Sequence, residues 1–218
     1  MTGRGKNWRT GMALAMFAAV AACNTRSSAP PPMLNVPAGR VCADKISTIG
    51  ARAVVFDGED PGAIDLVIDE GSTCLTGADG KKSLYQVVEL PDVGAEYILS
   101  VESFQQGNSI FAPELQLLGS NGSVIRDVSH DDMMFRGTSL TALLRAKPGE
   151  RYLLIRSDPQ TVGLGESRVM DSIRQNGGYN AATGGTFYVY TGATTTNTMT
   201  YSHGGKLKII VRHMPKRS

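Results

Sequence analysis

The sequence predicts an all-β domain, an antiparallel β-sandwich of about nine strands that is jelly-roll-like and carries one short inserted helix. Short apolar and β-branched runs recur along the chain, and turn-forming Gly, Pro, Asn and Asp residues separate them. Glycine supplies 25 of the 218 residues, which suits a chain rich in turns. Hydrophobic residues make up 41% and charged residues 19%, which excludes a charged disordered chain and a coiled coil.

The N-terminus has the pattern of an export signal. Residues 1–10 contain three basic and no acidic residues, and the uncharged stretch 11–22 is too short to span a bilayer as a helix. This stretch ends in VAAC, which resembles the lipobox of bacterial lipoproteins. The resemblance implies acylation of Cys23 and, because Asn24 rather than Asp follows, an outer-membrane location with the domain in the periplasm or at the surface. The alternative is an ordinary signal peptide with an incidental cysteine.

The chain therefore divides into a signal peptide (1–22), a lipidated cysteine with a proline-rich tether (23–39) and a β-sandwich domain (40–218). The tether contains three consecutive prolines and few apolar residues, a composition typical of an extended spacer. The formal net charge is +2, and the signal peptide removes three positive charges from it. Nucleic acid is thus not an expected partner, whereas the membrane is one, through the acyl chains.

Two further cysteines, Cys42 and Cys74, remain in the exported domain. An oxidising compartment favours a disulfide between them, and two buried free thiols are the alternative. Neither cysteine has another Cys or His at ligand spacing, so a metal site is not predicted there.

The strands are predicted from alternating or β-rich runs that end at turn signals. In the first run, Ile64, Leu66 and Ile68 share one face, and an Asp79-Gly80 turn follows it. The runs cover residues 63–69, 83–90, 95–104, 115–118, 124–128, 140–146, 152–156, 187–190 and 206–212.

Two tight turns predict hairpins. Asn121-Gly122 tolerates positive φ at both central positions, so it joins the fourth and fifth runs. Pro148-Gly149 suits a type II turn, which predicts a second hairpin between the sixth and seventh runs. Residues 161–176 differ, because Val169, Met170 and Ile173 fit helical spacing before a Gly-Gly pair, and these residues predict the inserted helix.

Four segments between residues 83 and 212 resemble, in the same order, segments of the MalM-like family, the maltose operon periplasmic proteins. They are SLYQVVELP, FAPELQLLGSNGSVIRDV, ERYLLIRSDPQTVG and TYSHGGKLKIIV. The resemblance implies an exported β-rich domain that operon context links to maltodextrin uptake. It implies no established reaction, and no catalytic residue is carried over.

Candidate catalytic and metal-binding residues each have a structural alternative. A Ser–His–Asp triad could be drawn with Asp131 or Asp171, but the G-x-S-x-G motif is missing. Residues 130–132 and 57–62 could bind a cation, but a solvated loop and a turn are their simpler readings. The sequence predicts no catalytic residue, no cofactor and no metal site. The histidines considered are His130, His203 and His213.

Tyrosines in the C-terminal third form the candidate ligand surface. A tyrosine ring offers a flat apolar face with a polar tip, which suits sugars and polar polymers. The alternative is that these rings pack on the sandwich. The four residues are Tyr179, Tyr188, Tyr190 and Tyr201.

Two functions from different classes are consistent with these patterns. The first is a non-catalytic outer-membrane lipoprotein, a periplasmic binding or assembly module linked to uptake of maltodextrin or another glycan, with an envelope protein or glycan as partner. The alternative is a hydrolase, or an accessory domain to one, that acts on an envelope polymer. The missing nucleophile motif favours the first.

Overall fold

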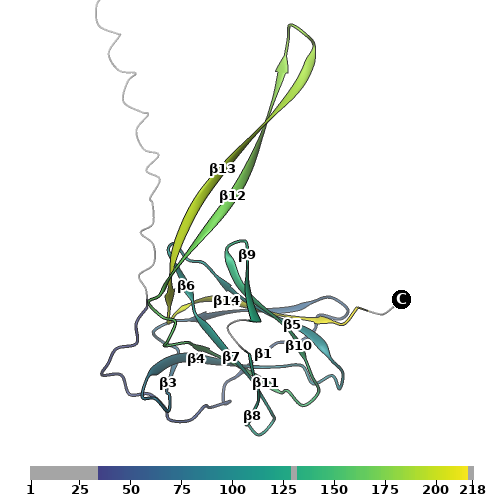
Figure 1. Cartoon of the computed structure of the whole chain (residues 1–218). Helices are drawn as coiled ribbons and strands as arrows, with labels where there is room; N and C mark the ends of the chain where they lie inside the picture. Colours follow the sequence, from purple (N-terminus) through teal and green to yellow (C-terminus); the bar gives the residue numbers. More distant parts are fainter. Residues whose placement is uncertain (1–33, 129–131, 216–218) are drawn as a thin grey trace, which may run out of the picture.

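The computed structural model describes residues 34–128 and 132–215, and almost all of its regular structure is β (Figure 1). Cys23 and the signal peptide lie outside the described residues. Two sheets make up the body, and a two-stranded ribbon projects from it. The first sheet contains β1 (Arg52–Ala53), β3 (Thr73–Thr76), β4 (Lys82–Glu89), β7 (Pro113–Leu118), β8 (Val124–Val128) and β11 (Tyr152–Ser157). The second contains β2 (Gly62–Ile68), β5 (Tyr97–Phe104), β9 (Met133–Arg136), β10 (Ser139–Ala146) and β14 (Gly205–His213).

Eight of these strands form a jelly roll. The first sheet runs β4-β11-β7-β8 and the second β2-β14-β5-β10, with β1, β3 and β9 added at the edges. Successive strands of this set cross from one sheet to the other, except for the β7–β8 hairpin. Two interleaved four-stranded sheets in this order are the jelly-roll arrangement, so the predicted fold class is confirmed. Each of the nine predicted runs falls on a strand, and β1, β3, β6 (Ser109–Phe111), β9 and β12 (Gly165–Asn180) were not predicted.

The core lies between the two sheets and follows the alternation of the sequence. Leu66 and Ile68 of β2 point inward, and Leu207 and Ile209 of β14 join them. Side chains of β4, β5, β7 and β11 close the layer from both sheets. Full burial of each aliphatic side chain contributes roughly 1.5–3 kcal/mol, so this layer is the main source of stability.

The N-terminal segment covers the outer face of the first sheet, where Ile46 packs on a second apolar cluster that includes Tyr85 and Leu154. The predicted Cys42–Cys74 disulfide is present and links this segment to β3. Backbone hydrogen bonds flank it, since the Ala43 N–H donates to the Cys74 carbonyl. The disulfide therefore joins hydrogen bonds and apolar packing in holding this segment against the first sheet.

One of the two predicted hairpins is wrong. The Asn121-Gly122 turn joins β7 to β8 as predicted, with Gly122 at φ 77°. The Pro148-Gly149 turn also forms, with Gly149 at φ 91° and the Glu150 N–H donating to the Lys147 carbonyl. It connects β10 to β11, however, and these strands lie in different sheets. Both edges of each strand are already paired, β10 with β5 and β9 and β11 with β4 and β7, so the turn becomes a crossover.

The predicted helix at residues 161–176 is also wrong, because β12 occupies most of this stretch. β12 pairs residue by residue with β13 (Gly185–Ser202), a strand rich in Thr and aromatic residues. Val169 and Ile173 are exposed, so their helical spacing had no apolar surface to pack against. A threonine-rich partner strand favours the extended conformation instead.

Replacing both Cys42 and Cys74 with Ala should lower the free energy of unfolding by roughly 3–4 kcal/mol, because the bond restricts the unfolded chain across a separation of 32 residues. Urea unfolding of the oxidised wild type and of the variant measures the difference. A reductant should lower the midpoint of the wild type alone. Equal midpoints for the oxidised wild type and the variant would contradict this prediction.

Candidate functional site, a projecting two-stranded arm

β12 and β13 form an antiparallel arm that stands out from the sandwich (Figure 1). Their pairing runs without interruption from Gly165 opposite Thr200 to Asn180 opposite Gly185. At about 3.4 Å per residue the arm extends roughly 50 Å. Its tip is a short turn in which the Asn180 side chain accepts the Ala182 N–H, at 3.0 Å, and Gly184 adopts φ 66°.

The base of the arm is built into the sandwich. The last three residues of β13 pair in parallel with β6. Tyr201 is only 4% exposed there and packs with Ile110, Leu140 and Met199 in a third apolar cluster. Its hydroxyl donates to the Glu166 carboxylate at 2.8 Å. Burial and this hydrogen bond raise the pKa of Tyr201 far above its usual value, so the hydroxyl stays a donor.

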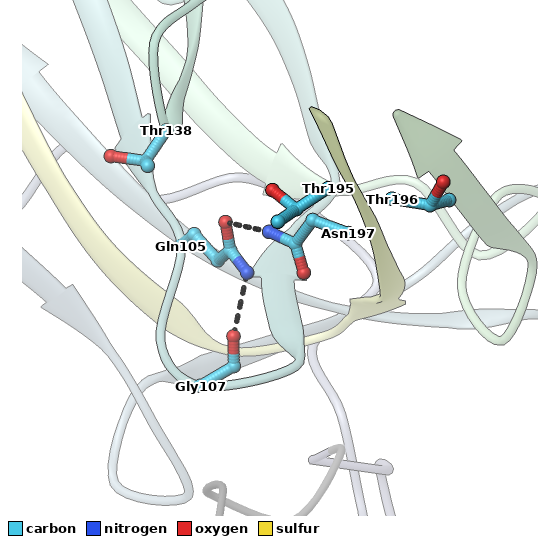
Figure 2. Close-up of a pocket in the computed structure, with 6 residues that line it drawn as sticks. All are labelled: Gln105, Gly107, Thr138, Thr195, Thr196 and Asn197. Atoms are coloured by element: carbon cyan, nitrogen blue, oxygen red, sulfur yellow. Dashed lines mark hydrogen bonds between the residues drawn. The ribbon is translucent and has the colours of Figure 1, made fainter. Parts of the chain in front are cut away.

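Contacts with neighbouring loops hold the lower part of the arm. The Arg168 guanidinium lies 4.1 Å from the centre of the Phe135 ring and donates to the Gly137 carbonyl at 3.2 Å. On β13, the Asn197 amide donates to the Gln105 side chain at 3.0 Å (Figure 2). These bonds set the direction in which the arm leaves the body.

A shallow pocket of about 550 Å³ lies beside this junction (Figure 2). The Gln105 amide spans it, donating to the Gly107 carbonyl at 2.7 Å while it accepts from Asn197. These hydrogen bonds connect β13 to the residues between β5 and β6. Its lining residues are Gln105, Gly107, Thr138, Thr195, Thr196 and Asn197.

The outer part of the arm exposes large apolar side chains. Tyr179, Tyr188 and Tyr190 are 67%, 60% and 65% exposed. Their partners across the ladder are Thr186, Gly177 and Gln175, and residues directly opposite each other share a face, so all three rings lie on one face of the arm. Residues 175–205 contain no Asp, Glu, Lys or Arg. The arm beyond Arg174 is therefore an uncharged aromatic surface.

Two glycines of β12 lie beneath aromatic rings of β13. A Cβ atom added to Gly177 would lie 3.1 Å from Tyr188, and one added to Gly178 would lie 2.5 Å from Phe187. The two pairs sit directly across the ladder, on opposite faces. Each ring thus covers the bare backbone of the facing glycine, which stabilises the strand pair and fixes the ring.

The structure brings three of the four predicted ligand-surface tyrosines together and separates the fourth. Tyr179, Tyr188 and Tyr190 share the outer arm, whereas Tyr201 is buried at the base. The glycine-rich stretch that contains them forms the two strands of the arm. Phe187 and Ile173 are exposed on the arm and were missed. The β-branched and aromatic composition of residues 186–198, with six Thr and three aromatic residues, is the signal that could have indicated a long strand there.

The histidines occupy different environments. His130 and Asp131 lie outside the described residues. The His213 ring stacks on Phe56, with 4.0 Å between ring centres. Asp171 lies on the arm and accepts the Thr194 hydroxyl at 2.7 Å.

His203 is 9% exposed, and its Nδ1 lies 2.7 Å from the Ser157 hydroxyl, which is fully buried. That hydroxyl also accepts the Leu84 N–H at 3.1 Å, so it connects His203 to β4. The neighbouring Asp158 carboxylate bonds to the Gln160 N–H and the Thr161 hydroxyl. The Ser–His pair therefore links the end of β11 to the turn between β13 and β14.

The other residues considered from the sequence form a turn. The Asp60 N–H donates to the Asp57 carbonyl at 2.9 Å, and Gly58 adopts φ 61°. Within residues 34–128 and 132–215, no group of three His, Cys, Asp or Glu residues could hold a metal ion. The same part of the chain contains no helix long and apolar enough to cross a membrane.

Two tyrosine variants should show that the base of the arm contributes more to the stability of the protein than its tip does. Tyr201→Ala is expected to lower the free energy of unfolding by about 3–5 kcal/mol, because it opens a cavity in a buried cluster. Tyr188→Ala should cost no more than about 1 kcal/mol, because its ring is exposed. Thermal or urea unfolding compares the two, and similar losses would show that the tip is part of the stable body.

The stability of the protein should fall as the pH drops below about 6.5. Burial lowers the pKa of His203, while Asp158 opposes that shift. In the unfolded chain a histidine has a pKa of about 6.5, so below this pH the unfolded chain binds a proton that the folded protein does not. Above this pH both states bind the same number of protons at this residue, and the destabilisation disappears. Urea unfolding between pH 7.5 and 5.5 measures this, and His203→Gln should lose less stability over that range. An equal loss of stability in the wild type and in His203→Gln would show that other titratable groups cause the pH dependence.

Comparisons of the chain with protein-family models, with curated proteins and with solved structures find no match. Its function is therefore inferred from the arm and from the sequence patterns.

Proposed function

We propose that this chain is a non-catalytic lipoprotein of the bacterial outer membrane, a periplasmic binding or assembly module whose binding element is the β12–β13 arm. The observation that carries the proposal is the projecting arm, on which three exposed tyrosines share one face in a stretch without charged residues. Contiguous exposed apolar surface on a soluble domain marks an interaction site.

The arm adds little to the folding of the sandwich. Its outer side chains lie outside the apolar clusters, and only its base joins one of them. An isolated two-stranded ribbon is at best marginally stable in water. Interactions at the outer half of the arm would supply stability that the sandwich does not, and a binding role explains why the ribbon extends so far.

The path of the chain supports a membrane anchor near the base of the arm. The Leu34 N–H donates to the Ser202 hydroxyl at 2.9 Å, and the His203 N–H donates to the Leu34 carbonyl at 3.1 Å. The N-terminal segment therefore joins the body beside the last residues of β13. With Cys23 acylated, the chain between Cys23 and Leu34 reaches at most about 40 Å. This tether would keep the base of the arm close to the membrane.

The chemistry of the tip also fits the glycan link that the MalM-like resemblance suggests. Tyr179, Tyr188 and Tyr190 present flat faces with hydroxyl edges on one side of the arm. Such faces stack on sugar rings, and the hydroxyls bond to sugar hydroxyls. A maltodextrin or another envelope glycan is the ligand class that these rings suit.

The test is photo-crosslinking in the source bacterium, with p-benzoylphenylalanine at position 188 and, as control, at Ile49, which is 94% exposed on the sandwich. Adducts are expected from position 188 and not from position 49. Cys23→Ser should lose labelling by a fatty-acid analogue and reduce the adducts, because the arm leaves the membrane. Equal labelling of both proteins, or no adduct specific to position 188, would overturn the proposal.

A further inference from the structure

The outer part of the arm has two long free strand edges. We define the tip segment as residues 173–180 of β12 and 185–192 of β13, which pair only with each other among the described residues. In an antiparallel pair, every second residue of each strand directs its N–H and C=O away from the partner. Each edge of the tip segment therefore presents a row of backbone donors and acceptors to solvent.

These edges lack the features that prevent strand pairing elsewhere in the protein. The edge strands β1 and β9 are two and four residues long. β8 carries Arg126 and Asp127 and sits beside a register shift in β7. Short strands, charges and bulges are the usual protection of a sheet edge. The tip segment is long, contains no proline, and has Arg174 as its one charged residue.

The two edges are complementary to each other, which points to a second copy of this chain as the partner. The internal ladder shows that the β12 and β13 sequences pair over their whole length, including the rings of Tyr188 and Phe187 over Gly177 and Gly178. The free edge of β12 in one copy can meet the free edge of β13 in the next in the same antiparallel sense. β13 has no charge, so this pairing creates no like-charge contact, whereas two β12 edges paired in parallel and in the same register would bring two copies of Arg174 together.

The orientation of neighbouring copies follows from the anchor. Pairing β12 with β13 of the next copy makes both arms point in the same direction. The chain enters the body beside the base of the arm, at Leu34, so a lipid on Cys23 of each copy would hold all copies on one membrane in the same orientation. Confinement by a short tether raises the effective concentration of one arm next to another.

We propose that the arms of adjacent copies pair edge to edge, the β12 tip segment of one with the β13 tip segment of the next, and form a continuous sheet of arms. The proposal rests on the proposed function, in which the arm is the binding element. Each added copy leaves one edge free, so assembly continues beyond a dimer until a ring closes or a filament forms. The tyrosines of successive arms would then line one face of the shared sheet.

The first experiment measures the size of the lipidated full-length protein in detergent and on phospholipid vesicles, by mass photometry and amine crosslinking. Wild type should give species of three or more copies. A short-arm variant lacks residues 173–178 and 187–192; it keeps the native turn and the alternation of faces, because six residues leave each strand. This variant should be monomeric.

Val189→Lys, which adds a charge to the uncharged edge, should reduce oligomers roughly tenfold or more, and the control Ile49→Lys should not.

The second experiment tests the direction of pairing with Asn176→Cys and Val189→Cys, which lie opposite each other in the internal ladder. Oxidation should form a disulfide between the two variants when they are mixed and none within either variant alone, because a disulfide joins neighbouring strands but not strands two apart. A monomeric wild type in both media would overturn the proposal. If vesicles alone protected the tip segment from proteolysis, without oligomers, the tip would be assigned to lipid. Adducts of position 188 with other molecules only would overturn the pairing of copies and leave the proposed function standing.

Discussion

The turn at residues 202–204 is the constraint on which the arrangement of body, arm and N-terminal segment depends. The Ser202 side chain receives the Leu34 N–H, and His203 bonds to Ser157 at the end of β11. Between β13 and β14 there is no room for a side chain at Gly204, where a Cβ would lie 2.5 Å from Leu34 and 2.7 Å from the Ile68 carbonyl. One glycine thus lets the arm, the central strand β14 and the chain from the proposed anchor meet at one point.

Alternation of apolar residues was enough to predict the sandwich but not how its strands connect. Leu66 and Ile68 point inward as predicted, because side chains along a strand alternate between the two faces of the sheet. The Pro148-Gly149 turn has its predicted conformation yet joins two sheets, since turn chemistry fixes four residues and not the partners of the flanking strands. The helix prediction failed for a related reason. Few apolar residues over 161–176 fit either period, and the long-range pairing with β13 decided between them.

The candidate site was predicted in composition but not in shape. Three tyrosines share one face because the pairing of β12 with β13 places Tyr179 opposite Thr186, which is on the same face as Tyr188 and Tyr190. No local pattern in a glycine-rich stretch could show this pairing. Tyr201 has the same residue type and a similar sequence context, but β6 pairs beside it and buries its ring. Burial of a residue at the end of a strand depends on which distant segment lies next to it. Sequence periodicity carries no information on that neighbour.

The arm separates two kinds of recognition by using different parts of the same strands. Its faces carry the rings of Tyr188 and Phe187, each fixed over a glycine whose missing side chain leaves room for it. Its edges carry backbone groups that no side chain specifies. A ligand that stacks on the face does not use the backbone groups of the edge, and a strand that pairs at the edge leaves the rings exposed. Repetition of the arm along a shared sheet would therefore multiply the number of tyrosine faces without changing any of them, which converts weak stacking at each ring into strong binding of a long polymer.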